Sequence, residues 1–244
     1  MLNKLKPIRS NSLKNEVISH FENLILSGKI APGEKLPPER ELARKLEVSR
    51  PVVHEALLDL ELKGFVTIKP RRGATIIDYR KEGTIALLTS LLEYQNTDSI
   101  DPQILSGLLH FRTLTETEFT RLSALNRTET DIKIFEEILE KEKQVNQKTA
   151  VAVAELDFEL HHSIAFSTGN LIYPLLLNSF KQMYIIVLTR FYQNKNIIPM
   201  IFRLHRELIA FIKSKNSIEA EQKMREILNL GENELKKLLN KQEE

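Results

Sequence analysis

The sequence predicts a mostly α-helical protein, in which an N-terminal winged helix-turn-helix of three helices and a β-hairpin is joined to an all-helical bundle of six or seven helices. Apolar residues recur at spacings of three and four along most of the 244 residues, and only 8 Gly and 9 Pro interrupt them. Two short β-branched runs flank a Gly-containing turn between residues 65 and 78, and this β pattern disappears beyond residue 81. We therefore expect residues 1–80 to form the winged helix and residues 81–244 to form the bundle.

The three helices of the first domain are predicted from apolar spacing and from residues that begin and end helices. The first helix has Gly28 at its end, and the second begins with Pro37-Pro38 and acidic residues. The third begins at Ser49, a natural N-cap, and closes at Gly64. A turn at residues 70–73 joins the two strands. The predicted helices cover residues 12–27, 37–46 and 49–64, and the strands cover residues 65–69 and 74–78.

Beyond residue 81 the helical period continues, broken by short polar or Gly-containing stretches. Thr128 and Ser217 are positioned as helix caps. Pro102 and Pro174 fall in first turns, where a missing N–H matters least. The predicted helices cover residues 82–95, 101–125, 130–148, 150–168, 171–193, 198–215 and 217–241.

Composition excludes several classes of protein. The chain has no Cys, which excludes a disulfide framework and thiolate chemistry and agrees with a reducing compartment. We find neither a signal peptide nor an apolar run long enough to cross a bilayer, so we expect a cytoplasmic protein with no membrane partner. Residues 1–82 hold 16 Lys and Arg against 11 Asp and Glu, whereas the remainder holds 19 against 22. A mildly basic first domain on a mildly acidic body suits nucleic-acid binding.

The third helix carries residue types that suit the major groove of DNA. Its predicted buried face is apolar, and Ser49, Arg50 and His54 occupy the opposite face near its start. An arginine there can donate two hydrogen bonds to a guanine edge, and a helix start binds phosphate. Arg40 is placed to reach the flanking DNA backbone. The hairpin turn, which contains Arg72-Gly73, is placed to approach a minor groove. The alternative is that these are solvated charges on a small basic domain.

Residues 8–78 resemble the N-terminal domain of the GntR family of bacterial transcription regulators. The stretches Ile30–Ala43, Val48–Leu57 and Leu62–Val66 carry the resemblance. It implies a homodimer that reads a palindromic operator in double-stranded DNA. The operator contacts that it implies come from Arg40, Ser49, Arg50, Arg72 and Gly73. The chain departs from the family at His54, where most members have Arg, so we expect a different operator preference.

The bundle resembles the effector-binding domain of the FadR subfamily across nearly all of residues 82–241. The stretches Ala154–Phe158 and Ala165–Tyr184 carry this resemblance. It implies that Arg112 contacts a small-molecule effector, for which we favour a long-chain acyl-CoA or a fatty acid, because arginine suits carboxylates and phosphates.

Each of these bundle residues also has a structural interpretation. Arg112 lies among apolar residues, where an unpaired guanidinium would be costly, so its alternative is a salt bridge to Glu116 or Glu118. Asn178 and Tyr184 are predicted to line the same cavity, and their alternative is to complete hydrogen bonds of the core.

Many members of this subfamily hold a divalent metal through one Asp and three His, and the resemblance places three of these ligands here. Asp157 and His161 lie at i and i+4, a spacing that brings two ligands to one ion, and His205 opens a later helix. Ile227 stands at the fourth position, so the set is incomplete and we expect weak metal affinity. The alternative is a buried polar pair of Asp157 and His161 without metal.

Three classes of function compete for this sequence. We favour a homodimeric transcription regulator, not an enzyme, whose effector changes its operator affinity; the effector is an acyl-CoA or fatty acid, or alternatively a metal-chelated small carboxylate. A metal-dependent hydrolase is opposed by the lack of a His-Glu-x-x-His motif, a nucleophile elbow and a phosphate-binding glycine loop. An architectural DNA binder is opposed by the Arg and His residues inside the bundle. The sequence indicates no cofactor beyond such an effector or metal.

Overall fold

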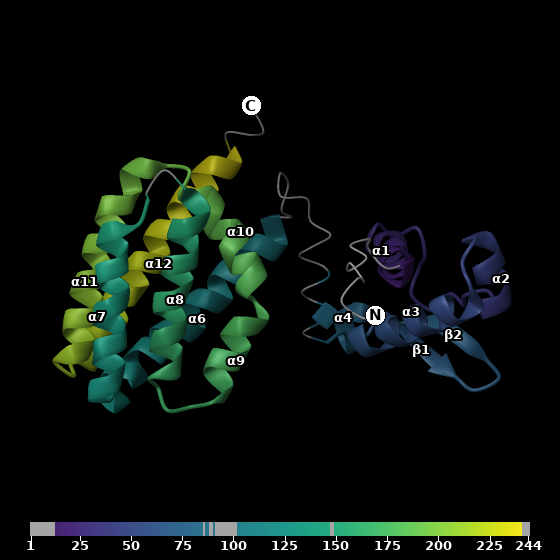
Figure 1. The fold of residues 1–244 in the computed structure, drawn as a ribbon, viewed down its shortest axis with the longest axis horizontal. Helices are drawn as coiled ribbons and strands as arrows, with labels where there is room; N and C mark the ends of the chain where they lie inside the picture. Colours follow the sequence, from purple (N-terminus) through teal and green to yellow (C-terminus); the bar gives the residue numbers. More distant parts are fainter. Residues whose placement is uncertain (1–12, 85, 88–89, 91–101, 147–148, 241–244) are drawn as a thin grey trace, which may run out of the picture. The chain divides into compact units, whose positions relative to one another are not determined.

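The computed structural model describes residues 13–84, 86–87, 90, 102–146 and 149–240. The chain divides into two compact units, Met1–Asn96 and Thr97–Glu244, which we call the head and the helical domain (Figure 1). No helix within the described ranges is long and apolar enough to cross a membrane.

The head consists of three helices followed by a two-stranded antiparallel hairpin and a short helix (Figure 1). The strands pair from Val66 opposite Ile76 to Lys69 opposite Gly73. This order confirms the predicted winged helix-turn-helix. The elements are α1 (Leu13–Leu26), α2 (Glu39–Lys45), α3 (Arg50–Lys63), β1 (Val66–Lys69), β2 (Gly73–Ile76) and α4 (Tyr79–Glu82).

One apolar core holds the head together. The apolar faces of α1 and α3 pack on each other and against the hairpin, and Phe65 is fully buried between α3 and β1. Two ion pairs also join α1 to α3: Lys14 Nζ lies 2.7 Å from Asp59 Oδ2, and Lys63 Nζ lies 2.6 Å from Glu22 Oε1. Because the apolar contacts lie on one side of α3, the other side of that helix faces solvent.

The end of α3 requires a glycine. Gly64 lies in the left-handed region at φ 86°, and a Cβ on it would lie 3.1 Å from the backbone oxygen of Glu82. The segment after β2 therefore packs against the end of α3, and Leu87 joins the core of the head. The described residues directly after β2 thus pack with the head.

The helical domain is arranged around a central helix, α8. α8 is apolar on most of its sides, as expected of a buried helix, and other helices of the domain surround it (Figure 1). The helices of this domain are α6 (Pro102–Asn126), α7 (Glu129–Gln144), α8 (Ala150–Phe166), α9 (Ile172–Ser179), α10 (Lys181–Phe191), a 3-10 turn (Lys195–Ile197), α11 (Ile198–Lys213) and α12 (Ser217–Asn240). The helices with the most extensive contacts to α8 are α6, α7, α9 and α10, while α11 and α12 both pack on α6.

The structure differs from the sequence pattern at residues 171–193, which form two helices rather than one. α9 ends at Ser179 and α10 begins at Lys181, with Phe180 between them at φ −103° and ψ 2°. The hydroxyl of Ser179 donates to the backbone oxygen of Leu175 at 3.0 Å, and a serine in this arrangement favours bending of a helix. The break turns the Phe180 ring into the core.

The other predicted helices of the bundle agree with α6, α7, α8, α11 and α12 to within a few residues, which confirms the all-helical prediction. The helix expected over residues 82–95 falls largely outside the described residues. The sequence pattern did not indicate α4, whose N-cap Asp78 accepts a hydrogen bond from the backbone N–H of Arg80 at 3.3 Å.

We expect Gly64→Ala to destabilise the head more than Gly28→Ala. Both glycines have positive φ, and left-handed strain costs a residue with a side chain about 1–2 kcal/mol. Only the Cβ at position 64 would also press on backbone atoms, because nothing lies within 4 Å of a Cβ at position 28. Calorimetric unfolding of the two full-length variants measures the difference. Equal losses of stability would show that the contact between the α3 end and the following segment is unimportant.

Candidate functional site

The solvent side of α3 presents the residues that the sequence analysis assigned to DNA. Its buried side is apolar, whereas the side chains of Arg50 and His54 are 70% and 52% exposed. Ser49 is the N-cap residue, yet its hydroxyl makes no capping hydrogen bond. α3 is thus a helix whose first turns offer a hydroxyl, a guanidinium and an imidazole to the outside, as a recognition helix requires.

A carboxylate that the sequence analysis missed holds two of these side chains. Glu39, the first residue of α2, accepts from Arg50 Nε at 3.0 Å and lies 2.7 Å from His54 Nδ1. The hydrogen bond with His54 lowers the pKa of Glu39 most; burial opposes it, and Arg50 lowers the pKa further. Glu39 therefore stays ionised and fixes where Arg50 and His54 point in the free protein. The sequence offered one indication of this role: Glu39 is the first residue of the helix that precedes α3.

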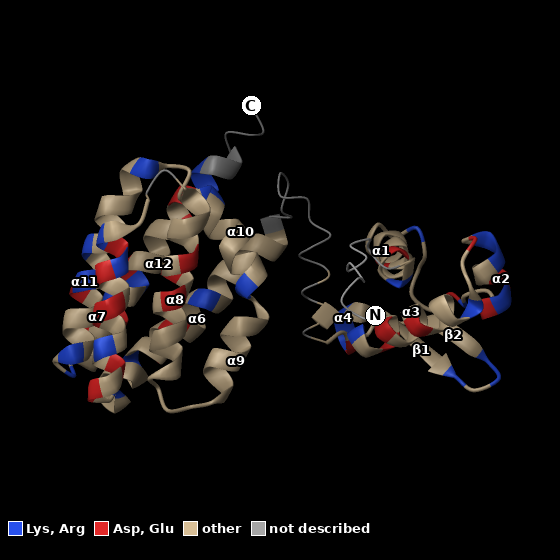
Figure 2. Ribbon diagram, in the orientation of Figure 1, with Lys and Arg blue, Asp and Glu red and all other residues tan. Residues whose placement is uncertain are grey.

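The hairpin turn and α2 add further positive charge (Figure 2). Arg71 and Gly73 adopt positive φ, of 63° and 82°, and the side chain of Arg72 between them is exposed. Lys35 pairs with β2 through Thr75, and its side chain would lie 3.7 Å from a Cβ on Gly73. Arg40, in the first turn of α2, is also exposed. We call the residues that the sequence pattern predicts to contact DNA the DNA-reading face. It comprises Arg40, Ser49, Arg50, His54, Arg72 and Gly73.

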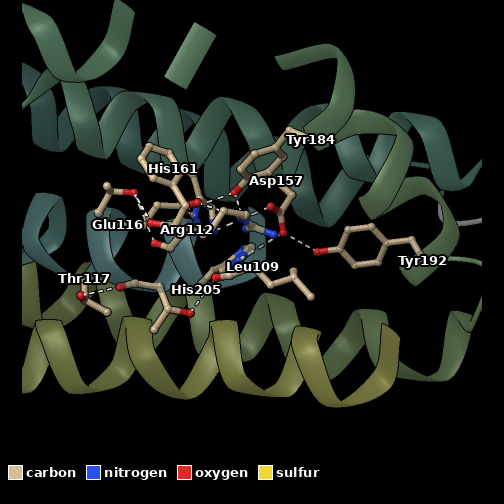
Figure 3. A network of polar contacts seen from close by, with 12 residues as sticks. Leu109, Arg112, Glu116, Thr117, Asp157, His161, Tyr184, Tyr192 and His205 are labelled. Atoms are coloured by element: carbon tan, nitrogen blue, oxygen red, sulfur yellow. Dashed lines mark hydrogen bonds and ion pairs between the residues drawn. The ribbon is translucent and has the colours of Figure 1, made fainter. Parts of the chain in front are cut away.

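In the helical domain, the three predicted metal ligands converge on one buried point (Figure 3). Asp157 and His161 come from α8 and His205 comes from α11, and one ligand atom from each lies within 4.8 Å of the others. The Nε2 atoms of both histidines lie 3.7 Å from carboxylate oxygens of Asp157. Asp157 Oδ1 and the two Nε2 atoms make no hydrogen bond with any described residue. We call these three residues the three-ligand centre.

A second set of buried groups orients the three-ligand centre. Glu116 of α6 contacts Nδ1 of His161, and Glu142 of α7 lies 2.5 Å from Nδ1 of His205. A carboxylate at Nδ1 retains the proton there and leaves the Nε2 lone pair for the centre. Tyr192 donates to Asp157 Oδ2 at 2.5 Å, which leaves Oδ1 free. Burial and the nearby Asp157 raise the pKa of Tyr192, so its phenol remains a donor.

The charges of this region suit a divalent cation. Three buried carboxylates, Asp157, Glu116 and Glu142, face one buried guanidinium, that of Arg112. The remaining negative charge is balanced either by protons on the imidazoles or by a bound cation. Burial lowers the pKa of His205, but Glu142 outweighs burial and raises it. The residues present therefore fit a metal ion through two imidazoles and one carboxylate, while Ile227, buried on α12, offers no donor atom.

Arg112 is buried beside this centre and is paired. Its Nε donates to Glu116 Oε1 at 2.8 Å, its Nη2 donates to the Tyr184 hydroxyl at 2.6 Å, and its guanidinium lies 4.0 Å from the Tyr184 ring centroid. Of the two salt bridges considered from the sequence, the one with Glu116 is present, whereas Glu118 pairs with Arg121. Burial alone would raise the pKa of Glu116, but Arg112 and His161 outweigh it and lower the pKa to about 2.

Arg112 also lines a small cavity. It has a volume of about 10 Å³, room for about one water molecule. Apart from Arg112 and Tyr184 its lining is apolar, and consists of Leu108, Phe111, Leu177 and Phe180.

The prediction that Asn178 lines this cavity is wrong. Asn178 is exposed on α9, and so is Leu175, at 62%. The buried side of α9 carries Pro174 and Leu177. One residue further along the helix is a rotation of about 100°, which turns Asn178 away from Arg112. The hydrophobic sequence of residues 171–193 predicts a single helix and gives no sign of an exposed side.

Two family models cover almost the whole described chain. Residues 13–76 match the model described as bacterial regulatory proteins, gntR family. Residues 78–241 match the model described as the FadR C-terminal domain.

Individual proteins agree with these matches. The Uxu operon transcriptional regulator of Escherichia coli (strain K12) is 34% identical over 199 residues, which are 79% of this chain and 68% of that protein. A fatty acid metabolism regulator protein of Shewanella sp. (strain MR-7) is 28% identical over 201 residues, 82% of this chain and 80% of that protein. The structure of Streptococcus agalactiae GntR matches with a TM-score of 0.50 and 25% identity, covering 90% of this chain and 99% of that chain.

We expect Glu116→Gln to destabilise the helical domain in a pH-dependent way. At neutral pH the substitution leaves Arg112 without its buried anion, and breaking a buried pair costs about 3–5 kcal/mol. Because the folded-state pKa of Glu116 is lowered to about 2 from the ordinary 4.5, the stabilisation by its charge is complete above pH 4.5 and is lost as the pH falls toward 2. The difference in urea stability between wild type and variant should therefore shrink over that range.

The matched control is Glu118→Gln on the same helix, since Glu118 pairs with Arg121 at the surface. This control should change stability little at any of these pH values. A loss for Glu116→Gln that stays constant from pH 7 to pH 2 would contradict the assigned ion pair.

Proposed function

Because this chain belongs to the gntR family of bacterial regulatory proteins and carries a FadR C-terminal domain, we propose that it binds a palindromic operator as a homodimer and that a ligand in the helical domain changes its operator affinity. Proteins of this family are transcription regulators, which are not enzymes. We further propose that the ligand is a long-chain fatty acid or its CoA thioester. The observation that carries this proposal is Arg112, a buried and permanently charged side chain in the wall of an apolar cavity.

The head would read DNA through the DNA-reading face. Arg50 has the donors for a guanine edge in the major groove, and His54 beside it reaches a base edge or a phosphate. Ser49 and Arg40 lie at helix starts, where phosphate is favoured, and Arg72 at the hairpin turn would enter a minor groove. Two copies of this face related by a twofold axis would match a palindrome, since dimer symmetry sets half-site spacing.

The cavity combines the two kinds of group that a fatty acyl site needs, a cation and apolar side chains. The guanidinium of Arg112 suits an anionic head group, and four apolar side chains suit methylenes. Its volume of about 10 Å³ is too small for an acyl chain, so binding requires a wall to move. Phe180 lines the cavity where α9 and α10 join, so a change in the angle between these helices would widen it. Similarity to a fatty acid metabolism regulator protein supports this ligand class.

A second candidate ligand is a small carboxylate held together with a divalent metal. The observation that favours it is the set of three unpartnered, buried atoms on Asp157, His161 and His205. These residues would hold the ion, which supplies a positive centre for the carboxylate of the ligand. Ile227 contributes no donor, so part of the coordination shell would be open to that ligand or to water.

Coupling between the helical domain and the head is reciprocal on either proposal. A ligand that lowers operator affinity by a given factor binds the operator-bound protein more weakly by the same factor. The ligand therefore acts only through a difference in its affinity for two states of the protein.

We expect Arg50→Ala to weaken operator binding by about 1–3 kcal/mol, the value of a good contact between a side chain and a base. Thermal stability should hardly change, because the Arg50 side chain is 70% exposed. The measurement is fluorescence anisotropy with an operator selected from random DNA. Arg80→Ala is the control, since Arg80 is also exposed but pairs with Asp78 outside the DNA-reading face. If Arg50→Ala unfolds the head, Arg50 is a structural residue.

The ligand proposal is tested by adding fatty acids and acyl-CoAs of increasing length to the protein–operator complex. Each buried methylene contributes about 0.8 kcal/mol, so affinity should rise about fourfold per methylene until the cavity is filled. Arg112→Met should weaken long and short chains by the same factor, because it removes the head-group contact and leaves the apolar side chains of the cavity in place. Arg121→Met, on the same helix but paired at the surface with Glu118, should leave binding unchanged.

The second candidate ligand, a small carboxylate held with a divalent metal, predicts a different result in the same assay. If no acyl compound changes DNA binding, while a dicarboxylate or hydroxy acid does so only with added divalent metal, the second candidate replaces the first.

A further inference from the structure

We propose that Glu116 couples the cavity at Arg112 to the three-ligand centre, so that an anion in the cavity and a divalent metal at the centre strengthen each other's binding. The proposal rests on the proposed function, because it requires both the anion site and the metal site named there. It adds the residue that links the anion site to the metal site, and it states that the two ligands bind with positive cooperativity.

Among the hydrogen bonds and ion pairs of the described residues, those of Glu116 reach both Arg112 and a histidine of the three-ligand centre (Figure 3). Its Oε1 accepts from Arg112 Nε at 2.8 Å, and its Oε2 contacts Nδ1 of His161 and accepts from the Tyr184 hydroxyl at 3.3 Å. Its side chain is 2% exposed, so water does not screen either contact. A single buried negative charge is thus shared between a guanidinium and an imidazole.

This sharing gives the coupling its direction. An anion that binds the guanidinium of Arg112 competes with Glu116 for that guanidinium. The interaction of Glu116 with Arg112 then weakens, and its hydrogen bond with His161 becomes stronger. A carboxylate that binds the Nδ1 proton more strongly makes Nε2 a better electron donor. Nε2 of His161 is the unpartnered atom that faces Asp157 and His205. Anion binding should therefore raise metal affinity, and by linkage metal binding raises anion affinity by the same factor.

The chain contains a matched control for this role. Glu142 contacts Nδ1 of His205 as Glu116 contacts Nδ1 of His161, and it is equally buried. The hydrogen bonds and ion pairs described for Glu142 include none with Arg112. Both carboxylates orient a ligand of the three-ligand centre, but only Glu116 also contacts the cation of the cavity.

The experiment measures Co²⁺ affinity of the full-length protein by calorimetry and by the visible absorption of bound Co²⁺, with and without saturating decanoate. In the wild type, decanoate should raise Co²⁺ affinity by at least about fivefold, and Co²⁺ should raise decanoate affinity by the same factor. Glu142→Gln should weaken Co²⁺ binding by about 10–100-fold, as loss of an outer-shell carboxylate does, and keep the decanoate effect. Glu116→Gln should weaken Co²⁺ binding and abolish the decanoate effect.

Arg112→Met keeps the test decisive if Glu116→Gln does not fold. It removes the guanidinium and leaves Glu116 on His161, so Co²⁺ affinity should rise in the absence of decanoate and should not respond to it. If Arg112 only stabilises the fold, Arg112→Met should bind Co²⁺ more weakly than the wild type, and this result would overturn the proposal.

The remaining outcomes separate this proposal from the proposed function. If decanoate coupling survives in Glu116→Gln, the anion reaches the metal directly and Glu116 is not the link. If wild-type Co²⁺ and decanoate bind independently, or if Co²⁺ does not bind, the coupling is wrong, although operator release by acyl compounds alone would still support the acyl ligand. Absence of operator release by any anion, with the coupling intact, would instead contradict the proposed function.

Discussion

Compensation of buried charge is the constraint on which the arrangement of the helical domain depends. Glu116, Glu142 and Asp157 come from α6, α7 and α8, and the groups they contact come from α6, α8, α10, the residue directly after α10, and α11. An unpaired ion in this interior costs several kcal/mol, so each helix is held where its polar side chain meets the others. Burial keeps the phenols of Tyr184 and Tyr192 protonated, so they serve as donors that add no charge. The polar network therefore joins α6, α7, α8 and α11 through contacts that a different packing of these helices would break.

Most of the fold follows from information local in the sequence. The head is recognisable because each element has its own signal: a period of three to four residues, a cap, or a glycine at a turn. Arg50 and His54 were assigned to DNA because they share a helix whose other face is apolar. Asp157 and His161 were paired for a similar reason, since residues at i and i+4 lie on one side of a helix. Such inferences need no knowledge of which helices meet.

The residues that the sequence did not reveal act through partners far away in the chain. Glu142 lies 63 residues from His205, and Tyr192 lies 35 residues from Asp157. Glu142 occurs in a helix rich in Glu and Lys, where nothing marks one carboxylate as buried. Asn178 was misplaced because α9 has a solvent side, which carries Leu175 as well as Asn178 and which hydrophobicity alone does not indicate. In each case the missing information is which surfaces pack together.

The carboxylate of Glu39 has a consequence for the encounter of the head with DNA of arbitrary sequence. Such binding is driven largely by the release of counterions as protein cations neutralise phosphates. The charge of Arg50 is already balanced by Glu39 at 3.0 Å, so this arginine displaces few ions from DNA that offers no suitable base edge. If the head binds DNA as we propose, Arg50 adds little to the salt dependence of binding to such DNA, and its contribution is reserved for sites with a matching base edge.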